Sequence, residues 1–148
     1  MAAKWQKLDI DVPDDLGPSE RKKVADLVID HIIRRTESGK DKNGDKFPAY
    51  SEDYVDSLDF KIAGKSKSRV DLKLSGDMLA SLDLLTEKKG MIRIGFEKGS
   101  EENARADGNI RGTYGADSPK RGKKRDFLGI DRKVLKQIID EVRDDNEG

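Results

Sequence analysis

The chain has 148 residues, enough for one domain with a single hydrophobic core, and we expect residues 1–148 to form that one domain. Charged residues make up 41% of the chain and hydrophobic residues 34%, so the core is small for this length and the chain gains from partners. The 30 basic and 30 acidic residues balance, which argues against a protein that binds nucleic acid over its whole surface but leaves local basic patches open. The lack of cysteine excludes disulfides and thiol-based metal or redox sites.

The N-terminal region shows no targeting or membrane segment. It contains no apolar run of signal-peptide length, and no stretch of the chain approaches the roughly 20 apolar residues of a membrane span. Side chains alternate from Leu8 to Val12 and the pattern stops at Pro13, so residues 5–12 are predicted to form a strand or extended arm within an N-terminal arm of residues 1–17. We therefore expect a protein that is soluble when made and has no membrane contact.

The strongest helix is predicted over residues 18–38. Pro18 suits the first helical position, Glu20 is favoured in the first turn, and Gly39 supplies a stop. Between these ends apolar side chains recur at spacings of three and four residues, at Val24, Leu27, Val28 and Ile32. This pattern is typical of a helix that buries one face.

The stretch over residues 70–96 contains a helix start, a turn and two alternating segments without a gap. Ser75 can cap a helix of one to two turns. Residues 82–87 and 92–96 alternate on either side of a turn at Gly90, which is typical of an antiparallel hairpin. Each large apolar side chain gains roughly 1.5–3 kcal/mol on burial, so a helix is expected to cover the face that carries Ile92, Ile94 and Phe96.

The C-terminal third begins with the least regular segment of the chain. Residues 97–124 are predicted to form an extended glycine-rich loop, within which residues 109–116 are a candidate for an additional strand. The glycines of this segment are Gly99, Gly108, Gly112, Gly115 and Gly122. Residues 126–130 are expected to return to the core, followed by a closing helix over residues 131–143 and a frayed tail over residues 144–148.

Two motifs between the long helix and the hairpin resemble ligand sites, and each has a simpler interpretation. We expect here a polar loop over residues 39–50, a short helix capped by Ser51, and a flexible link over residues 63–69. The spacing of a calcium-binding loop is met by Asp41, Asn43, Asp45 and Glu52. Lys46, however, stands at the position where the sharp turn of such a loop needs glycine, so an ordinary Asn-Gly turn is favoured over a calcium site. Residues 64–66 end like a phosphate-binding loop, but the first glycine of that motif is missing.

His31, the only histidine, lies on the apolar stripe of the predicted long helix. With no cysteine and no second histidine, a packed side chain is favoured over a metal ligand or a catalytic base. Carboxylates are numerous but show no catalytic spacing, and no nucleophile–base pair stands out. We therefore predict no catalytic residue, no metal and no cofactor, in a protein that is not an enzyme.

The one dense basic cluster consists of Lys120, Arg121, Lys123, Lys124 and Arg125. Such a run can contact the phosphates of a nucleic acid, and contacts of this kind weaken steeply with salt. No aromatic residue is interleaved, so sequence-specific readout is not expected. Three interpretations stay open: contact with a DNA backbone, contact with an acidic protein partner, and a solvated loop.

Several short segments follow one another in a distinctive order across roughly residues 40–141, namely GDKFPAYSEDY, DLKLSGDMLASL, IRIGF, NARADGNIRGTYG and RDFLGI. This order resembles the virion-morphogenesis or tail-completion proteins of tailed bacteriophages. The more specific pieces are LSGDML at residues 74–79 and RDFLGI at residues 125–130, whereas residues 101–108 depart from the aromatic and histidine residues common in that family. The resemblance implies a structural role for the matching positions Phe47, Leu74, Gly76, Met78, Leu79, Phe127, Leu128 and Gly129.

The resemblance also implies a function. Members of that family are non-enzymatic and form rings, usually hexameric, in the neck or at the tail end, where a tail-terminator-like ring joins the tail tube or sheath to the head-completion proteins of the connector. It implies a location in the virion after assembly in the host cytoplasm, and it allows non-specific contact with packaged DNA. The N-terminal arm, the polar loop near Asn43 and the glycine-rich segment are segments that a ring subunit could order against its neighbours.

The sequence thus predicts an α+β fold with long loops. A small antiparallel sheet around residues 82–96, joined by residues 5–12, is expected to pack against the helices at residues 18–38 and 131–143. The expected function is that of a phage neck or tail-completion subunit. The alternative is a small nucleic-acid-binding protein that uses the basic cluster at residues 120–125.

Overall fold

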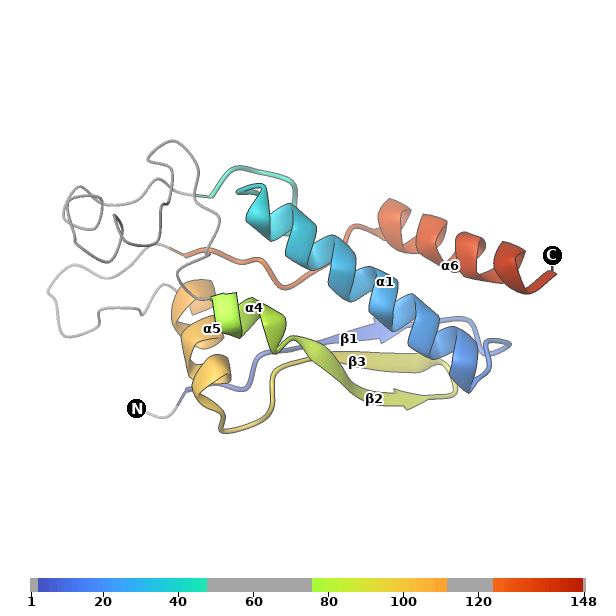
Figure 1. Ribbon diagram of the computed structural model, residues 1–148, viewed down its shortest axis with the longest axis horizontal. Coiled ribbons are helices and arrows are strands. Elements are labelled where there is room, and N and C mark those ends of the chain that lie inside the picture. The colour runs from blue at the N-terminus through green and yellow to red at the C-terminus, as the bar shows by residue number, and fades with distance from the viewer. Residues whose placement is uncertain (1–2, 48–75, 112–123, 148) are drawn as a thin grey trace, which may run out of the picture.

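The computed structural model describes residues 3–47, 76–111 and 124–147 (Figure 1). Within these ranges the architecture is α+β, as predicted, with a small antiparallel sheet and four helices. In chain order the elements are β1 (Lys7–Asp11), α1 (Pro18–Glu37), α4 (Gly76–Ala80), β2 (Asp83–Lys88), β3 (Met91–Gly95), α5 (Glu101–Arg111) and α6 (Arg132–Glu147).

The sheet has the strand order β1-β3-β2, so β3 is the middle strand, and both neighbours run antiparallel to it. Leu8 lies opposite Ile94 and Ile10 lies opposite Ile92, which places the apolar side chains of β1 and β3 on one face. Gly90 occupies the turn between β2 and β3 with a φ of 81°. The predicted hairpin and the predicted N-terminal strand are therefore confirmed.

Strand β2 departs from the strict alternation that its sequence predicts. The register shifts between Leu84 and Thr86, so that two residues of β2 stand opposite one residue of β3 at a β-bulge. Leu84 and Thr86 therefore lie on opposite faces, whereas the alternation predicted one face for both. The bulge also brings Glu87 to the inner face, where its carboxylate forms an ion pair with Arg21 of α1.

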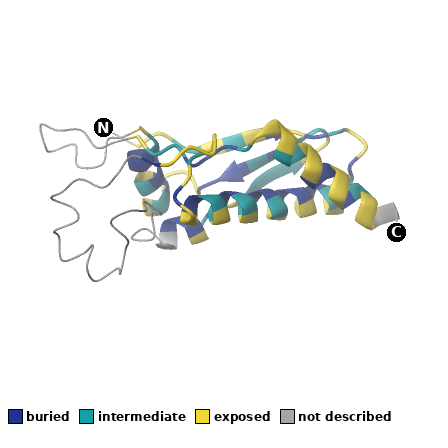
Figure 2. Ribbon diagram, turned by 90° about the horizontal axis from the view of Figure 1, so that it is seen from above, coloured by how far each residue is buried: buried dark blue, intermediate teal, exposed yellow. Residues whose placement is uncertain are grey.

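Helix α1 lies over the apolar face of the sheet, as predicted, and α6 packs along α1 on the same side of the sheet (Figures 1 and 2). Pro18 opens α1, and the Gly17 N–H donates to the Glu20 side chain at 3.0 Å, which satisfies a backbone group at the helix start. Gly39, with a φ of 86°, follows the helix end. The buried side chains of α1 are Arg21, Val24, Ala25, Val28, Ile32 and Thr36.

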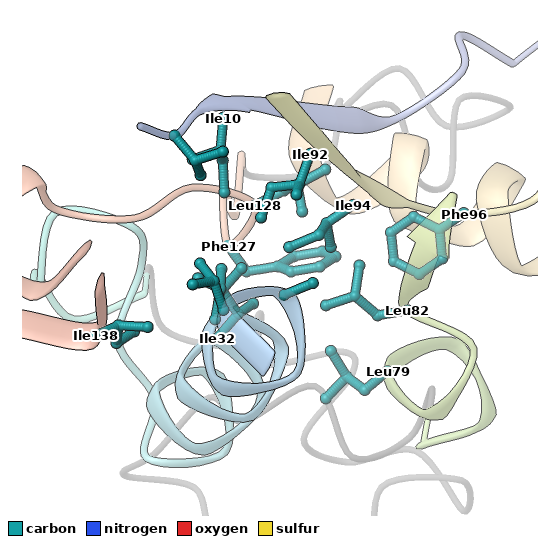
Figure 3. Packing of buried hydrophobic residues seen from close by; sticks show 14 of the residues in the cluster. Ile10, Ile32, Leu79, Leu82, Ile92, Ile94, Phe96, Phe127, Leu128 and Ile138 are labelled. Carbon is teal, nitrogen blue, oxygen red and sulfur yellow. The ribbon is translucent and has the colours of Figure 1, made fainter. Parts of the chain in front are cut away.

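The described core residues form one cluster that joins the sheet, α1, α4, α6 and the segment before α6 (Figure 3). Phe96 and Phe127 are both fully buried and meet edge to face, with 6.2 Å between ring centroids and 80° between ring planes. Leu79 of α4 lies near Leu82, on the side of the core away from Ile10 (Figure 3). Because Phe127 and Leu128 are buried, the prediction that residues 126–130 return to the core is confirmed.

The prediction of an extended loop over residues 97–124 is wrong for Glu101–Arg111, which form α5. Ser100 explains the helix start, because its Oγ accepts a hydrogen bond from the Asn103 N–H at 3.0 Å, as an N-cap residue does. Acidic residues fill the first turn, where the helix dipole favours them. The strand considered over residues 109–116 is wrong for its first part, which ends α5, and its remainder lies outside the described residues.

At the C-terminus, α6 continues through residues 144–147, so the prediction of a frayed tail from residue 144 is wrong for these positions. No glycine or proline interrupts this segment, and the helix therefore has no local reason to stop. The short helix α4 is present as expected, although Ser75, its predicted cap, lies outside the described residues. The short helix expected after Ser51 and the link over residues 63–69 also lie outside them.

Gly95 in β3 is expected to resist any side chain. A Cβ at this position would stand 2.6 Å from the carbonyl O of Gln6 and 2.8 Å from Cα of Lys7, and both are backbone atoms. Gly95→Ala must therefore push β1 away from β3, and we expect it to lower the free energy of unfolding by about 1–3 kcal/mol in urea denaturation. The control Gly17→Ala meets its nearest atom at 3.7 Å and should cost less than about 1 kcal/mol. Equal losses would contradict the close approach of the two strands.

Candidate functional site

The residues that carry the family resemblance lie in the core rather than at an exposed site. Those that are buried are Phe47, Met78, Leu79, Phe127 and Leu128. Gly129 is also buried, Gly76 is the first residue of α4, and Leu74 lies outside the described residues. The buried motif residues therefore support the fold, and none of them offers a polar group for chemistry.

The RDFLGI segment is fastened to the end of α1 by Arg35. Nη2 of Arg35 donates to the carbonyl O of Phe127 at 2.6 Å and to that of Gly129 at 2.9 Å. Burial lowers the pKa of this guanidinium, and two nearby carboxylates oppose that shift. A Cβ on Gly129 would lie 2.8 Å from Cδ and 2.9 Å from Cβ of Lys42. The glycine of this segment is therefore explained by close packing.

The structure describes the last two residues of the basic cluster. Lys124 is exposed, and Arg125 is half-buried with its backbone N–H donating to the carbonyl O of Asn109 at 2.7 Å, near the end of α5. The other three residues, Lys120, Arg121 and Lys123, lie outside the described residues. Contact with DNA, contact with an acidic partner and a solvated loop all stay predictions for this cluster.

The loop that resembles a calcium site is closed by Asp41. Its Oδ1 accepts hydrogen bonds from the N–H groups of Asn43 at 2.8 Å and Asp45 at 3.0 Å, and Gly44 has a φ of 85°. This arrangement is an Asx turn over an Asn-Gly pair, so the turn interpretation is confirmed. Glu52 lies outside the described residues, and the described part of the chain holds no group of three or more histidine or acidic residues placed to bind a metal ion.

His31 is half-buried on α1, where burial and then the charge of Arg35 lower the pKa of its imidazole. The lowered pKa favours the neutral ring at pH 7, as expected of a packed histidine. Residues 64–66, which end like a phosphate loop, lie outside the described residues. On the described surface, the groove between α1 and α6 is lined by charges of both signs around two apolar side chains, namely Lys23, Asp26, Leu27, Glu141, Val142 and Asp145.

A polar cluster that the sequence analysis missed holds the N-terminal arm on α5. Oδ1 of Asn103 accepts from the Gln6 N–H at 2.8 Å, and Nδ2 of Asn103 donates to the carbonyl O of Lys4 at 3.1 Å. Oδ1 of Asp107 accepts from Nε2 of Gln6 at 2.9 Å, and Arg111 donates twice to the same carboxylate, at 2.6 Å each. We refer to Gln6, Asn103, Asp107 and Arg111 as the arm clamp.

The arm clamp changes the expectation for the N-terminal arm. Asn103 and Asp107 are only 2% and 3% exposed, so their polar groups need these partners to be stable in the fold. The described part of the arm is therefore ordered on the chain's own body, and the idea that it waits for a neighbouring subunit is wrong for these residues. A spacing of four residues links Asn103, Asp107 and Arg111, and this was the signal that the sequence offered for a polar helix face.

Three comparisons with known proteins found no relative: no protein-family model, no curated protein and no solved structure matches the chain. None of the described helices has the length and apolar character that a membrane span requires.

The arm clamp predicts a pH dependence of stability through Asp107. Burial raises the pKa of the Asp107 carboxyl, but hydrogen bonds from Arg111 and Gln6 outweigh burial and leave that pKa below its ordinary value. The folded state therefore favours the ionised carboxylate, and the stabilisation is present above the ordinary carboxyl pKa and is lost as pH falls below it. We expect Asp107→Asn to cost about 1–3 kcal/mol at pH 7 and much less near pH 2.

Urea denaturation of both proteins at the two pH values measures this difference. Asp11→Asn removes an exposed carboxylate of β1 and is the matched control, with an expected change within about 0.5 kcal/mol at either pH. A loss on Asp107→Asn that is equal at both pH values would show that ionisation of Asp107 does not stabilise the arm.

Proposed function

We propose that the protein is a structural subunit of a tailed-bacteriophage virion. In this role copies of the chain form a ring, hexameric in most proteins of the resembling family, at the neck or tail end, where the ring joins the tail tube to the head connector. The chain is made in the host cytoplasm and ends in the virion. The proposal rests on the order of the segments from GDKFPAYSEDY to RDFLGI.

One observation carries the proposal: the two more specific pieces of the resemblance serve one core. Met78 and Leu79 come from the LSGDML piece, and Phe127 and Leu128 come from the RDFLGI piece. All four side chains are buried in the same cluster, although the two pieces lie far apart in the sequence. A match that reflects a common fold requires the apolar positions of both pieces to be buried, and the burial of these four side chains supports the proposal.

Contacts between subunits are expected on the folded body, since the described arm and α5 are already ordered. Aliphatic side chains on the outer helices pack on the core yet stay half-exposed, among them Ile29, Ile33, Val134 and Leu135. In the described part of the chain β1 and β2 each have one strand neighbour, β3, so each strand keeps one edge without a strand partner. Apolar patches and sheet edges are surfaces that neighbouring subunits can cover.

Native mass measurement of the full chain tests the proposal, both alone and mixed with isolated phage tails or connectors. We expect a ring of equal subunits, either free in solution or formed only on the end of a tail tube or connector. A chain that stays monomeric and joins neither component contradicts the proposed role. Salt-steep binding of nucleic acid by such a monomer, lost on charge reversal at Lys120, Arg121 and Lys123, would favour the alternative function.

A further inference from the structure

The outer face of the sheet carries an aromatic side chain surrounded by cations. Trp5 is half-buried just before β1, and its Nε1–H donates to the carbonyl O of Phe96 at 2.7 Å. Three cationic groups lie close to its ring centroid: Nζ of Lys7 at 5.6 Å, Cζ of Arg93 at 5.5 Å and Nζ of Lys98 at 5.6 Å. We refer to these four residues as the Trp5 patch.

The cations of the Trp5 patch on the sheet lie on the side away from α1 and α6. Lys7 and Asp9 of β1 are exposed, and Arg93 lies opposite Asp9 on the same face of the sheet. Both α1 and α6 lie on the other face (Figure 1). Neither of them covers the patch.

We propose that the Trp5 patch binds single-stranded nucleic acid, with a base stacked on the indole of Trp5 and the neighbouring phosphates contacted by Lys7, Arg93 and Lys98. Proteins that bind single strands combine aromatic platforms with a basic groove in this way. The patch has both parts, whereas the cluster at residues 120–125 has only the charge. This inference does not depend on the proposed role in the virion.

The chemistry of the patch favours a nucleic acid over an acidic protein. A carboxylate gains only from the positive charge, but an unpaired base also gains from the face of the indole. Duplex DNA offers phosphates without free base faces, so a patch built on stacking prefers the single strand. The hydrogen bond to Phe96 holds the edge of the indole in place, which limits the ordering that a ligand must impose.

Asp9 competes with a ligand for the same cations. Its Oδ1 accepts from Nε of Arg93 at 2.6 Å, and its Oδ2 accepts from Nη2 of Arg93 at 3.2 Å and pairs with Nζ of Lys7 at 3.2 Å. The hydrogen bonds from Arg93 keep the pKa of Asp9 below its ordinary value, so the carboxylate is charged at neutral pH. Asp9 therefore restrains two of the three cations and sets the affinity of the patch.

Titration with a labelled oligodeoxythymidine strand tests the inference, followed by anisotropy of the label and by fluorescence of the protein. Trp5 is the only tryptophan of the chain, so quenching of tryptophan emission reports stacking at this position and nowhere else. We expect saturable quenching that runs parallel to the anisotropy change. Binding without quenching would place the strand elsewhere and overturn the inference.

Three variants separate stacking from charge. We expect Trp5→Leu to weaken binding about tenfold or more, since it removes the stacking surface. Lys98→Gln should lower the slope of log affinity against log salt concentration by about 0.7, the value for one phosphate contact to a single strand. The control for Lys98→Gln is Lys22→Gln, which removes an exposed cation of α1 on the other side of the molecule and should leave the slope unchanged.

The third variant, Asp9→Asn, is expected to tighten binding severalfold, because Arg93 and Lys7 lose a competing anion. Asp11→Asn changes the net charge equally on the same strand and should have a much smaller effect. A gain of binding on Asp9→Asn that Asp11→Asn lacks does not depend on the Trp5→Leu variant, so this pair keeps the test decisive if Trp5→Leu perturbs the arm. Equal changes in affinity for the two variants would show that binding depends only on net charge, and the inference would be wrong.

Polyglutamate and a duplex of the same length complete the test. Either polymer binding as tightly as the single strand would identify a surface that recognises charge alone, and the inference would be wrong. The absence of any binding at low salt would also overturn it. None of these outcomes bears on ring formation, which is measured without nucleic acid.

Discussion

The burial of one face of β3 is the constraint on which the rest of the structure depends. Ile92, Ile94 and Phe96 have no exposed surface, and the other elements are arranged so that this face is covered. β1 and β2 extend it sideways, α1 lies over it, and Phe127 arrives from the far end of the chain to meet Phe96. Each of these side chains gains roughly 1.5–3 kcal/mol on burial, so a chain with so few apolar residues cannot leave this face open.

Polar contacts attach the segments that the small apolar core does not hold in place. Arg35 holds the RDFLGI segment by two carbonyl groups, Arg21 of α1 pairs with Glu87 of β2, and the arm clamp joins the first residues to α5. Buried polar groups are costly unless their partners are in place, so each contact selects one arrangement of the segments it joins. In this protein apolar burial supplies much of the stability, while the paired polar groups specify how the outer segments attach.

The sequence predicted the elements whose buried face is apolar and missed those whose buried face is polar. The hairpin, α1 and α6 follow from alternation or from a stripe at helical spacing. Helix α5 lacks such a stripe, because Asn103 and Asp107 are among the residues it buries, and its start was marked by polar signals, namely the cap at Ser100 and the acidic first turn. The bulge in β2 was hidden because Leu84 and Leu85 are both apolar, so hydropathy does not show which of them faces the core.

The same distinction applies to surfaces. The basic cluster at residues 120–125 is visible in the sequence because its members are adjacent, whereas the cations around Trp5 come from positions 7, 93 and 98 and meet only through the pairing of β1 with β3. Local composition therefore does not predict that these three cations lie close together. The pairing that completes the core therefore also creates the one described surface where an aromatic ring and several cations coincide.

The ordered arm bears on how the proposed ring would assemble. A subunit whose arm and loops fold only on a neighbour loses their conformational entropy at the moment of association. Here residues 4–6 are held by α5, and residues 40–46 close on themselves, through contacts within one chain. A ring built from this body would join surfaces that already exist, and association would depend on how well those surfaces fit rather than on the cost of ordering them.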